Sequence, residues 1–560
     1  MSLVRINNTK EVERKGYMAD KSKNCIVLKE LVLPFIVLIT VLGVNTWFLL
    51  VRGNAFIDSD MASNVLAAVN ANAEHTLLSR NWYYSTGIGV FLDTHIFQFV
   101  LLFIKDNLFL VRTIGVLLMQ ILLILSFLFL MKQIKISRST AILFTAFTVA
   151  PISYWLLLMI SFGAYYIMST AYAIISIVLL IWFTKLDFST NRNRFVVSIV
   201  LTVGIGLITG LNGLKGMIFP YAPMLVMALF MLFITVRNNK VILGKENEFE
   251  LRVLIGTVIG TISYVVGFLI NSLYFSKIFE FEDKNNVVWG PFRVDKFIEG
   301  ISECISLLGY QSDEKVSFFT RETSLRPVFS LQGIANIFGL AIIGLFIISV
   351  VRLIMNYGVL SKVEQMMIVL LISSLLVGCV IFKLTEGYDT SAVYWVPLYP
   401  LMLTIIAIEL KTESFVFDMS PSVIALMLTF CVAVTSLSTI KLYQEAPMHA
   451  NPQLVNVAKW LEDNGYEKGY GTFWNSNSVT FLTNGKIDMW SVYGFDNLEL
   501  DKWLQKTSHN EKPEGDKIFA LIGPKDELDR DVFLQYMNTE PGIPEIVYQD
   551  DEGYIVVEYK

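Results

Sequence analysis

Residues 52–98 read RGNAFIDSDMASNVLAAVNANAEHTLLSRNWYYSTGIGVFLDTHIFQ and stand between two apolar segments, 31–51 and 108–131. Ionisable residues are concentrated in this stretch, among them Asp58 and Asp60. Next to helices that span hydrocarbon, ionisable groups occur where water or a substrate can reach them. We therefore expect this stretch to be an outer loop that carries the functional site, and the rest of the chain to be its scaffold.

The composition places the chain among membrane proteins. Hydrophobic residues make up 54% of the 560 residues, charged residues only 17%, and the mean hydropathy is +0.56. A water-soluble protein of this length would not tolerate so apolar a surface. The four cysteines are scattered without paired or CxxC spacing, so they indicate neither a disulfide framework nor a thiolate zinc site.

Apolar runs of about 17 to 25 residues, the length that crosses a bilayer, predict eleven spanning helices. They are expected at 31–51, 108–131, 140–160, 164–184, 195–211, 217–236, 253–275, 334–355, 364–382, 394–410 and 420–440. The lysines and arginines of the connections fall on the side of the N-terminus, so the positive-inside rule predicts a cytoplasmic N-terminal segment at 1–30 and a C-terminus outside. We expect a multi-pass protein of the cell membrane.

The sequence divides into a transmembrane domain at 31–440, with outer loops at 52–107 and 276–333, and an extracytoplasmic domain at 441–560. This tail carries 11 Lys and Arg against 21 Asp and Glu, a balance typical of an exported segment and contrary to nucleic-acid binding. Its patterns predict a small α/β fold. A helix is expected at 452–465 and strands within 486–492, 517–523, 545–551 and 554–560.

Apolar residues at helical spacing in ASNVLAAVNANAEHTLL, residues 62–78, predict an amphipathic helix on the membrane surface. Asp58, Ser59 and Asp60 then occupy its N-terminal end. Two interpretations stay open for the two carboxylates. Either they cap the helix and complement its dipole, or they take a direct part in a chemical reaction.

The segment FIDSDMASNVLAA, residues 56–68, follows the first predicted span and resembles the GT-C glycosyltransferases. It is most similar to the protein-O-mannosyltransferase-like and aminoarabinose-transferase-like branches, in which an acidic motif here carries the catalytic carboxylate. Met61 departs from that motif, because the family often has Glu there. Two fragments, GLITGLNGLKGMIFP at 206–220 and SAVYWVPLYPLMLTI at 391–405, partly resemble later family segments. The first retains the family's Lys-Gly, and the second has Val393 where the family has Arg.

The resemblance implies an inverting transfer of a sugar from a polyprenyl-phosphate carrier to a hydroxyl acceptor on the outer face of the membrane, in a cell-envelope glycan, lipid or protein. A carboxylate must take the proton of the acceptor, and cations must stabilise the departing phosphate. Alignment with the motif makes Asp60 the implied base and Asp58 the second choice. Lys215 is the first candidate for the donor phosphate, with a snorkelling lysine as the other interpretation.

Arg80 and Arg112 are further candidates for the phosphate, or else anchors at the interface and partners of nearby acids. Additional candidates for substrate contacts are Asp93, His95, Glu386 and Tyr394. No spacing matches a known metal motif, so we expect no metal site and no required cofactor. A divalent ion held by the Glu74 and His75 pair or the Asp93 and His95 pair is the alternative.

Two other classes of protein remain open. A transporter or flippase of lipid-linked sugars would place ionisable residues in mid-membrane and break helices in matching halves. Most central segments here contain no ionisable residue. A non-catalytic scaffold for envelope glycan assembly would keep the fold and lose the base, and Met61 in place of Glu leaves this alternative standing.

Overall fold

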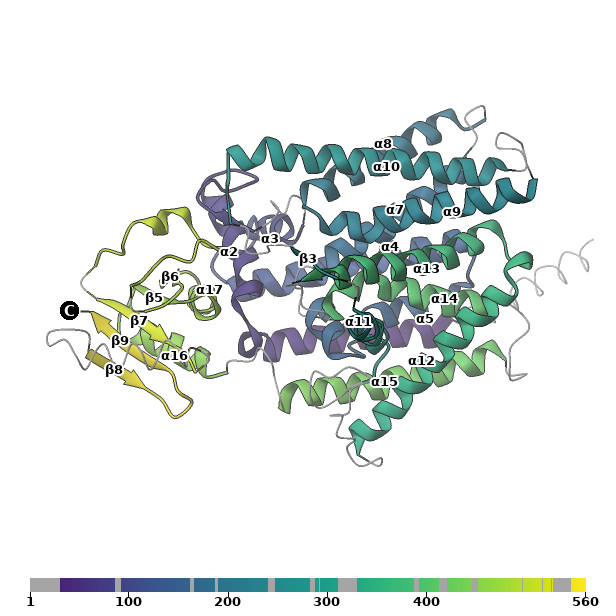
Figure 1. The fold of residues 1–560 in the computed structure, drawn as a ribbon. Coiled ribbons are helices and arrows are strands. Elements are labelled where there is room, and N and C mark those ends of the chain that lie inside the picture. Colours follow the sequence, from purple (N-terminus) through teal and green to yellow (C-terminus); the bar gives the residue numbers. More distant parts are fainter. Residues whose placement is uncertain are drawn as a thin grey trace, which may run out of the picture.

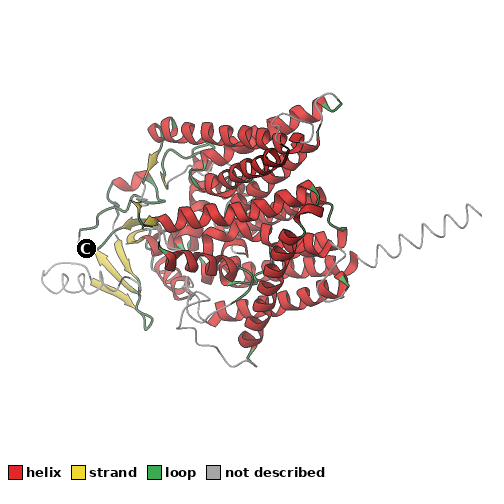
Figure 2. Ribbon diagram, turned by 45° about the vertical axis from the view of Figure 1, so that its right-hand side comes forward, coloured by secondary structure: helices red, strands yellow, loops and turns green. Residues whose placement is uncertain are grey.

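The computed structural model describes most of the chain, and everything below concerns these residues. They are 31–85, 92–161, 166–186, 190–239, 247–282, 288–291, 293–310, 330–386, 392–411, 420–445, 452–495, 497–515, 517–524, 526 and 545–559. A long helical bundle carries a small α/β domain at one end (Figure 1). Figure 2 shows that the large sheet is confined to that end.

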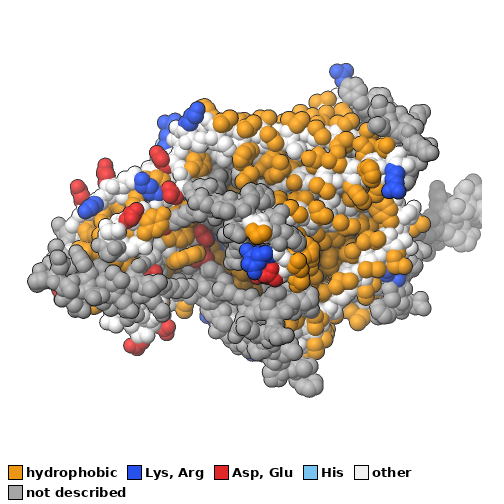
Figure 3. Space-filling view, viewed as in Figure 1, with side chains coloured by type: hydrophobic (Ala, Val, Ile, Leu, Met, Phe, Trp, Pro, Cys, Tyr) orange, Lys and Arg blue, Asp and Glu red, His pale blue; other side chains and the backbone are white. Residues whose placement is uncertain are grey.

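Ten helices in the described part of the chain are long and apolar enough to cross a membrane. The first is Leu31–Phe56, which ends in the 3₁₀ turn η1 (Gly53–Phe56). The others contain α4 (Leu108–Ile134), α7 (Tyr166–Lys185), α8 (Arg192–Leu211), α9 (Ala222–Asn239), α10 (Glu248–Leu273), α12 (Leu331–Met355), α13 (Lys362–Leu384), α14 (Tyr399–Lys411) and α15 (Pro421–Glu445). On the face shown in Figure 3, apolar side chains predominate over the described part of the helical bundle, and most acidic side chains lie on the α/β domain.

The predicted span at 140–160 is not a continuous helix. It forms α5 (Arg138–Thr148), a break, and then the short α6 (Tyr154–Leu156), which runs on into the single-turn helix η2 (Leu157–Ser161). Pro151 lies in the break, and the Ser153 side chain caps α6. Proline disfavours helix at the residue before it, which explains the interruption.

The broken segment nevertheless returns the chain across the bundle. The Lys185 ammonium at the end of α7 donates to the Gln133 carbonyl near the end of α4, at 2.8 Å. The two helices therefore end on the same face of the bundle, so the chain between them must cross back. The segment expected to span at 140–160 therefore crosses the bundle in two pieces, beside the ten long helices.

That shared face is held together by charged pairs. The Lys411 ammonium at the end of α14 lies 2.6 Å from the Glu364 carboxylate of α13 and 3.2 Å from the Ile134 carbonyl of α4. Lys362 pairs with Glu250 of α10, also at 2.6 Å. The predicted clustering of basic connections on one side of the membrane is reproduced by these contacts.

At the opposite end, short elements cover the bundle. They are α2 (Ser59–Ala73), β1 (Tyr83–Tyr84), α3 (Asp93–Leu101), η5 (Phe275–Lys277), β2 (Glu280–Phe281), β3 (Val288–Trp289), α11 (Val294–Ser306), β4 (Thr385–Glu386) and η7 (Ala392–Leu398). β1 pairs with β2, so the loop predicted at 52–107 is joined to the loop predicted at 276–333. α2 and α3 lie between the bundle and the α/β domain (Figure 1).

The α/β domain contains a five-stranded sheet in the order β6-β5-β7-β9-β8. Its elements are α16 (Pro452–Asp463), β5 (Lys468–Thr472), α17 (Phe473–Leu482), β6 (Asp488–Val492), β7 (Ile518–Ile522), β8 (Glu545–Gln549) and β9 (Ile555–Tyr559). β5 is parallel to both of its neighbours, whereas β9 is antiparallel to β7 and β8. The predicted helix and four strands are confirmed, and β5 was not predicted.

The surface position predicted for the first loop's helix is wrong. α2 is a helix, but Val65, Ala68 and Ala71 are buried, and α3 and α17 pack against it. An amphipathic pattern predicts one covered face, and it does not say whether lipid or protein covers it.

Candidate active site

Two carboxylates occupy the start of α2, at the end of the bundle that faces the α/β domain. Asp58 is the N-cap, and its Oδ1 accepts a hydrogen bond of 2.8 Å from the Met61 N–H. Asp60 lies in the first helical turn and is half-buried. The capping interpretation is thus confirmed for Asp58. Asp60 is the second residue of the helix, where its charge complements the positive end of the helix dipole.

A cationic side chain lies beneath Asp58. Arg112 of α4 is only 1% exposed, its charge interacts with that of Asp58, and its Nη2 lies 3.3 Å from the Met61 sulfur. Tyr443 of α15 is buried beside them, with its ring centroid 4.7 Å from that of Phe56. This burial suits Arg112 to act as the counter-ion of Asp58 more than to contact a lipid phosphate. Met61, the departure from the family motif, packs against the same guanidinium.

Asp93, the first residue of α3, faces α2 through an amide. The Asn64 Nδ2 donates to the Asp93 Oδ2 at 2.7 Å, and Asn64 follows Asp60 by one helical turn on the same face of α2. Burial raises the pKa of Asp93 to about 6, against the hydrogen bond from the Thr94 N–H and the positive charge of Lys215. A carboxyl group with this pKa changes protonation close to neutral pH.

Lys215 lies in the turn between α8 and the π-helical turn η3 (Met217–Tyr221), outside the spanning segments on either side. Its side chain is exposed, and its ammonium stands over the Tyr166 ring, 5.1 Å from the centroid. The Tyr166 ring meets that of Tyr394 edge-on, at a centroid distance of 6.5 Å. Three predicted residues from distant parts of the chain, Asp93, Lys215 and Tyr394, are therefore brought together.

Other predicted residues stand apart or are not described. Arg80 is exposed, and Asn70 donates a hydrogen bond to the carbonyl of its neighbour Asn81. Asn70 follows Asp60 by ten residues, which is about 15 Å along α2, so Arg80 lies far from Asp60. His95 is half-buried on α3, two residues after Asp93. The backbone of Glu386 belongs to β4, but its side chain lies outside the described residues. Within the described ranges, no group of three or more His, Cys, Asp or Glu is arranged to hold a metal ion.

Sequence reasoning missed three contributors to this site. Asn64 donates a hydrogen bond to Asp93, and the Tyr166 ring makes a cation–π contact with Lys215. Tyr443 interacts electrostatically with Asp58 and Arg112. The position of Asn64 one turn after Asp60 was a signal that the sequence offered. No comparable signal marked the two tyrosines, because each comes from an apolar helix and meets the site only through tertiary packing.

Comparisons with known proteins give the fold. No protein-family model and no curated protein sequence matches the chain. ArnT from Cupriavidus metallidurans bound to undecaprenyl phosphate matches with a TM-score of 0.54 and 13% identity, over 94% of this chain and 97% of that one, and its apo state gives the same values. The oligosaccharyltransferase AglB from Archaeoglobus fulgidus, in complex with an inhibitory peptide and a dolichol-phosphate, has a TM-score of only 0.46 at 12% identity, over 82% and 64% of the chains. The chain has the fold of the GT-C glycosyltransferases, as the resemblance in residues 56–68 predicts.

Proposed function

We propose that the protein is an inverting glycosyltransferase that moves a sugar from a polyprenyl-phosphate carrier to a hydroxyl acceptor at the outer face of the cell membrane. The observation that carries the proposal is the link from the start of α2 through Asn64 and Asp93 to the charge of Lys215. It brings a carboxylate able to take a proton and a cation able to bind phosphate to one end of the bundle. The ArnT structure, which has the same fold, is bound to undecaprenyl phosphate.

In this mechanism the acceptor oxygen attacks the anomeric carbon on the face opposite the phosphate. The bond between that carbon and the phosphate oxygen breaks, and its electron pair leaves with the phosphate. Asp60 takes the proton of the acceptor hydroxyl, and Lys215 stabilises the charge that develops on the phosphate. Asp58 fixes the first turn of α2 through its capping bond, with Arg112 as its counter-ion.

The topology follows from the same assignment. The end of the bundle bearing Lys185, Lys362 and Lys411 would face the cytoplasm, together with the N-terminal segment, because basic residues are retained on that side. The α/β domain and the two carboxylates of α2 would then face outward. Lipid-linked donors would reach the site from the outer leaflet.

The decisive experiment is transfer by Asp60→Asn. Asparagine keeps the size of the side chain but cannot accept the proton, so transfer from a purified polyprenyl-phosphate sugar should fall by roughly a hundredfold or more while donor binding persists. Asp58→Asn is the matched control. Asparagine is as good an N-cap as aspartate, so this variant should lose much less activity, although its thermal stability should fall because the buried Arg112 loses its counter-ion.

Different outcomes separate the three classes of protein. Near-normal transfer by Asp60→Asn would remove Asp60 from the mechanism. Absence of transfer by well-folded wild type with every donor tried would favour the scaffold. Movement of intact lipid-linked sugar between leaflets of a vesicle, without glycosidic bond formation, would favour the flippase.

A further inference from the structure

A cavity lies on the side of α2 opposite to Asp60. It has a volume of about 590 Å³ and is enclosed by the C-terminal half of α2, the end of α3, the start of α4, and the parts of the α/β domain around α17, β6 and residues 505–509. Leu66, Val69 and Ala73 contribute from α2. With 3.6 residues per turn, these positions point roughly opposite to Asp60 and Asn64. The cavity is therefore separated from the proposed reaction site by the body of the helix.

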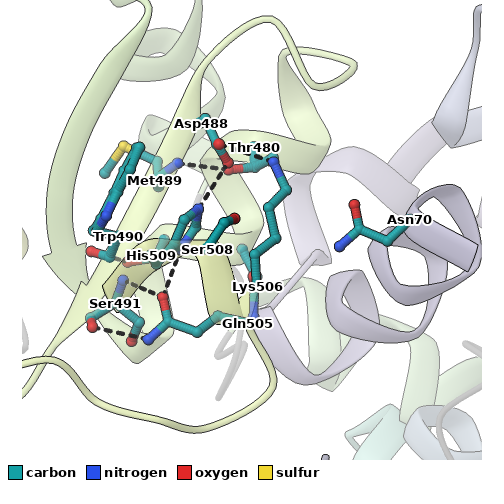
Figure 4. Close-up of polar contacts among 12 residues, drawn as sticks. Asn70, Thr480, Asp488, Met489, Trp490, Ser491, Gln505, Lys506, Ser508 and His509 are labelled. Atoms are coloured by element: carbon teal, nitrogen blue, oxygen red, sulfur yellow. Dashed lines mark hydrogen bonds and ion pairs between the residues drawn. The ribbon is translucent and has the colours of Figure 1, made fainter. Parts of the chain in front are cut away.

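The wall supplied by the α/β domain is rigidly held. Gln505 exchanges two hydrogen bonds with the backbone of Ser491, at 3.0 and 3.1 Å, which fixes the orientation of its amide. Its Oε1 lies 2.8 Å from the His509 Nδ1, and the His509 ring stacks on Trp490 at 4.1 Å. Figure 4 shows these groups together with Lys506, which lies between them and α2.

A charged pair completes this wall. The Asp488 carboxylate lies 2.8 Å from the Lys506 ammonium and 3.3 Å from the His509 Nε2. Burial alone would raise the pKa of Asp488, but His509 and Lys506 together lower it to about 2. The wall thus presents an ionised carboxylate, an ammonium, an amide and an imidazole in fixed positions.

The facing wall carries polar groups that are still available. Asn70, whose Nδ2 also donates to the Asn81 carbonyl at 3.3 Å, points across the gap toward Lys506 (Figure 4). Asn72, His75 and Lys105 also line the cavity, and within the described part of the chain their side chains make no hydrogen bond or ion pair. Available donors and acceptors opposite a rigid polar wall are the arrangement expected of a ligand site, since specificity comes from a few fixed polar groups in a concave pocket.

The balance of these groups favours a hydroxyl-rich ligand. Amides are frequent in the lining: Asn477 and Asn484, beside the already bonded Gln505 on the domain side, face Asn70 and Asn72 of α2. An amide offers donors and acceptors together, as a sugar hydroxyl does. The Lys506 ammonium in the domain wall is already paired with Asp488, and the exposed Lys105 can donate to a hydroxyl. The remaining lining includes the apolar faces of Trp82 and Met489, against which a sugar ring can pack.

The mouth of the cavity is apolar and exposed. Leu102 lines the cavity and is 63% exposed, and Phe103 beside it is 74% exposed. The Phe99 ring, also exposed, lies against that of Phe103 at 5.4 Å. Phe99 lies in the last turn of α3, and Leu102 and Phe103 follow it before the spanning helix α4, so the three lie where the outer edge of the bilayer meets the protein. Large exposed apolar side chains at this level suit contact with lipid chains.

We propose that this cavity binds the saccharide head group of a membrane-anchored glycolipid, with the lipid chains beside Phe99, Leu102 and Phe103. The site is distinct from the carboxylates of α2, and its occupancy does not depend on the function proposed above. The segment 505–510 also fastens the α/β domain to the first outer loop, through contacts such as the 2.9 Å hydrogen bond from Thr507 to Asn81. A ligand bound here therefore contacts both sides of the junction between the two domains.

The test uses the full chain in phosphocholine nanodiscs and a dodecyl maltoside that carries a photoreactive diazirine on its outer glucose. Cross-linked peptides are mapped by mass spectrometry. We expect saturable labelling within 66–75 and 477–509, competed by unlabelled dodecyl maltoside at lower concentration than by free maltose, and not by dodecylphosphocholine. Equal competition by maltose would overturn the lipid anchor, and equal competition by dodecylphosphocholine would overturn the saccharide.

Variants locate the labelling. Ala73→Trp places a large side chain into the cavity from an exposed helix end and should abolish saturable labelling. Asn72→Leu removes an amide that supports no described contact and should weaken competition by dodecyl maltoside roughly five- to tenfold. Asn456→Leu, on the exposed face of α16, is the matched control and should change nothing. Labelling that persists in Ala73→Trp, or that falls only near Asp60, would place the saccharide elsewhere.

Discussion

The two ends of the helical bundle hold their carboxylates in different ways. At the end with the basic connections, Glu364 and Glu250 each lie 2.6 Å from a lysine ammonium. At the end with the α/β domain, the Asp58 cap is bound by a backbone N–H and has Arg112 as its counter-ion, whereas Asp93 is bound by the Asn64 amide. Charges that join helices are neutralised by a direct partner. Asp93, in contrast, is oriented by a neutral amide, which leaves its charge to act on what enters the site.

The strongest test of this contrast breaks a pair at the basic end. Lys411→Met leaves the buried Glu364 carboxylate without its ammonium, so it should destabilise the protein by about 3 kcal/mol, as losing one partner of a buried pair does. Transfer per folded molecule should not change. Thermal unfolding in detergent and transfer assays measure the two effects.

A second substitution supplies the control for that experiment. In Lys411→Met with Glu364→Gln, both charges are gone, and most of the lost stability should return. A stable Lys411→Met protein would show that the pair does not hold the helices together. A selective loss of transfer would show that the two ends are not separate in their roles.

The next prediction concerns the cation at the other end. Lys215→Ala should weaken donor binding roughly ten- to a hundredfold, because a charge-assisted contact contributes about 1.5 to 3 kcal/mol. Thermal stability should hardly change, since the side chain is exposed. Lys277→Ala, another exposed lysine just beyond α10, is the matched control. Unchanged donor affinity in Lys215→Ala would assign Lys215 to snorkelling.

The contrast also explains which parts of the molecule could be predicted from sequence. Apolar runs mark spanning helices directly, so all ten long spans were anticipated. The helix expected at 140–160 is divided near Pro151, and the one expected at 217–236 is kinked at Phe219, before Pro220. β5 was missed because KGYGT has the glycines that strands usually lack. Gly469 is needed there, since a Cβ would lie 2.5 Å from the Phe519 ring of the next strand. A packing requirement of this kind is invisible before the neighbouring strand is known.

The candidate site was predictable in its acids and less so in its partners. Asp58 and Asp60 stood out because carboxylates beside a spanning segment are unusual. The link from Asn64 to Asp93 joins residues 29 apart, and that from Lys215 to Tyr166 joins two separate helices. Such contacts depend on how helices pack, and the spacing of residues along the chain does not specify them.

The smallest expected effect concerns the protonation of Asp93. Its pKa of about 6 lies above the ordinary value of 3.8 because the group is buried, so the folded protein binds a proton there more tightly than the unfolded chain does. The resulting contribution to stability is fully present below pH 3.8 and is lost as the pH rises through 6. If the ionised form interacts with Lys215 during transfer, activity should change in the opposite direction and fall as the pH drops below 6.

The measurement is the pH dependence of transfer between pH 5 and 8 for wild type and Asp93→Asn. In wild type, activity should decrease by up to about tenfold per pH unit below 6, because one ionisation controls it. Asparagine can still accept the Asn64 hydrogen bond but does not titrate, so this acid limb should disappear and leave a lower, flatter profile. An unchanged acid limb in Asp93→Asn would move the titrating group elsewhere, with Asp60 as the next candidate. It would also mean that sugar transfer does not depend on the charge of the carboxyl group that the Asn64 amide orients.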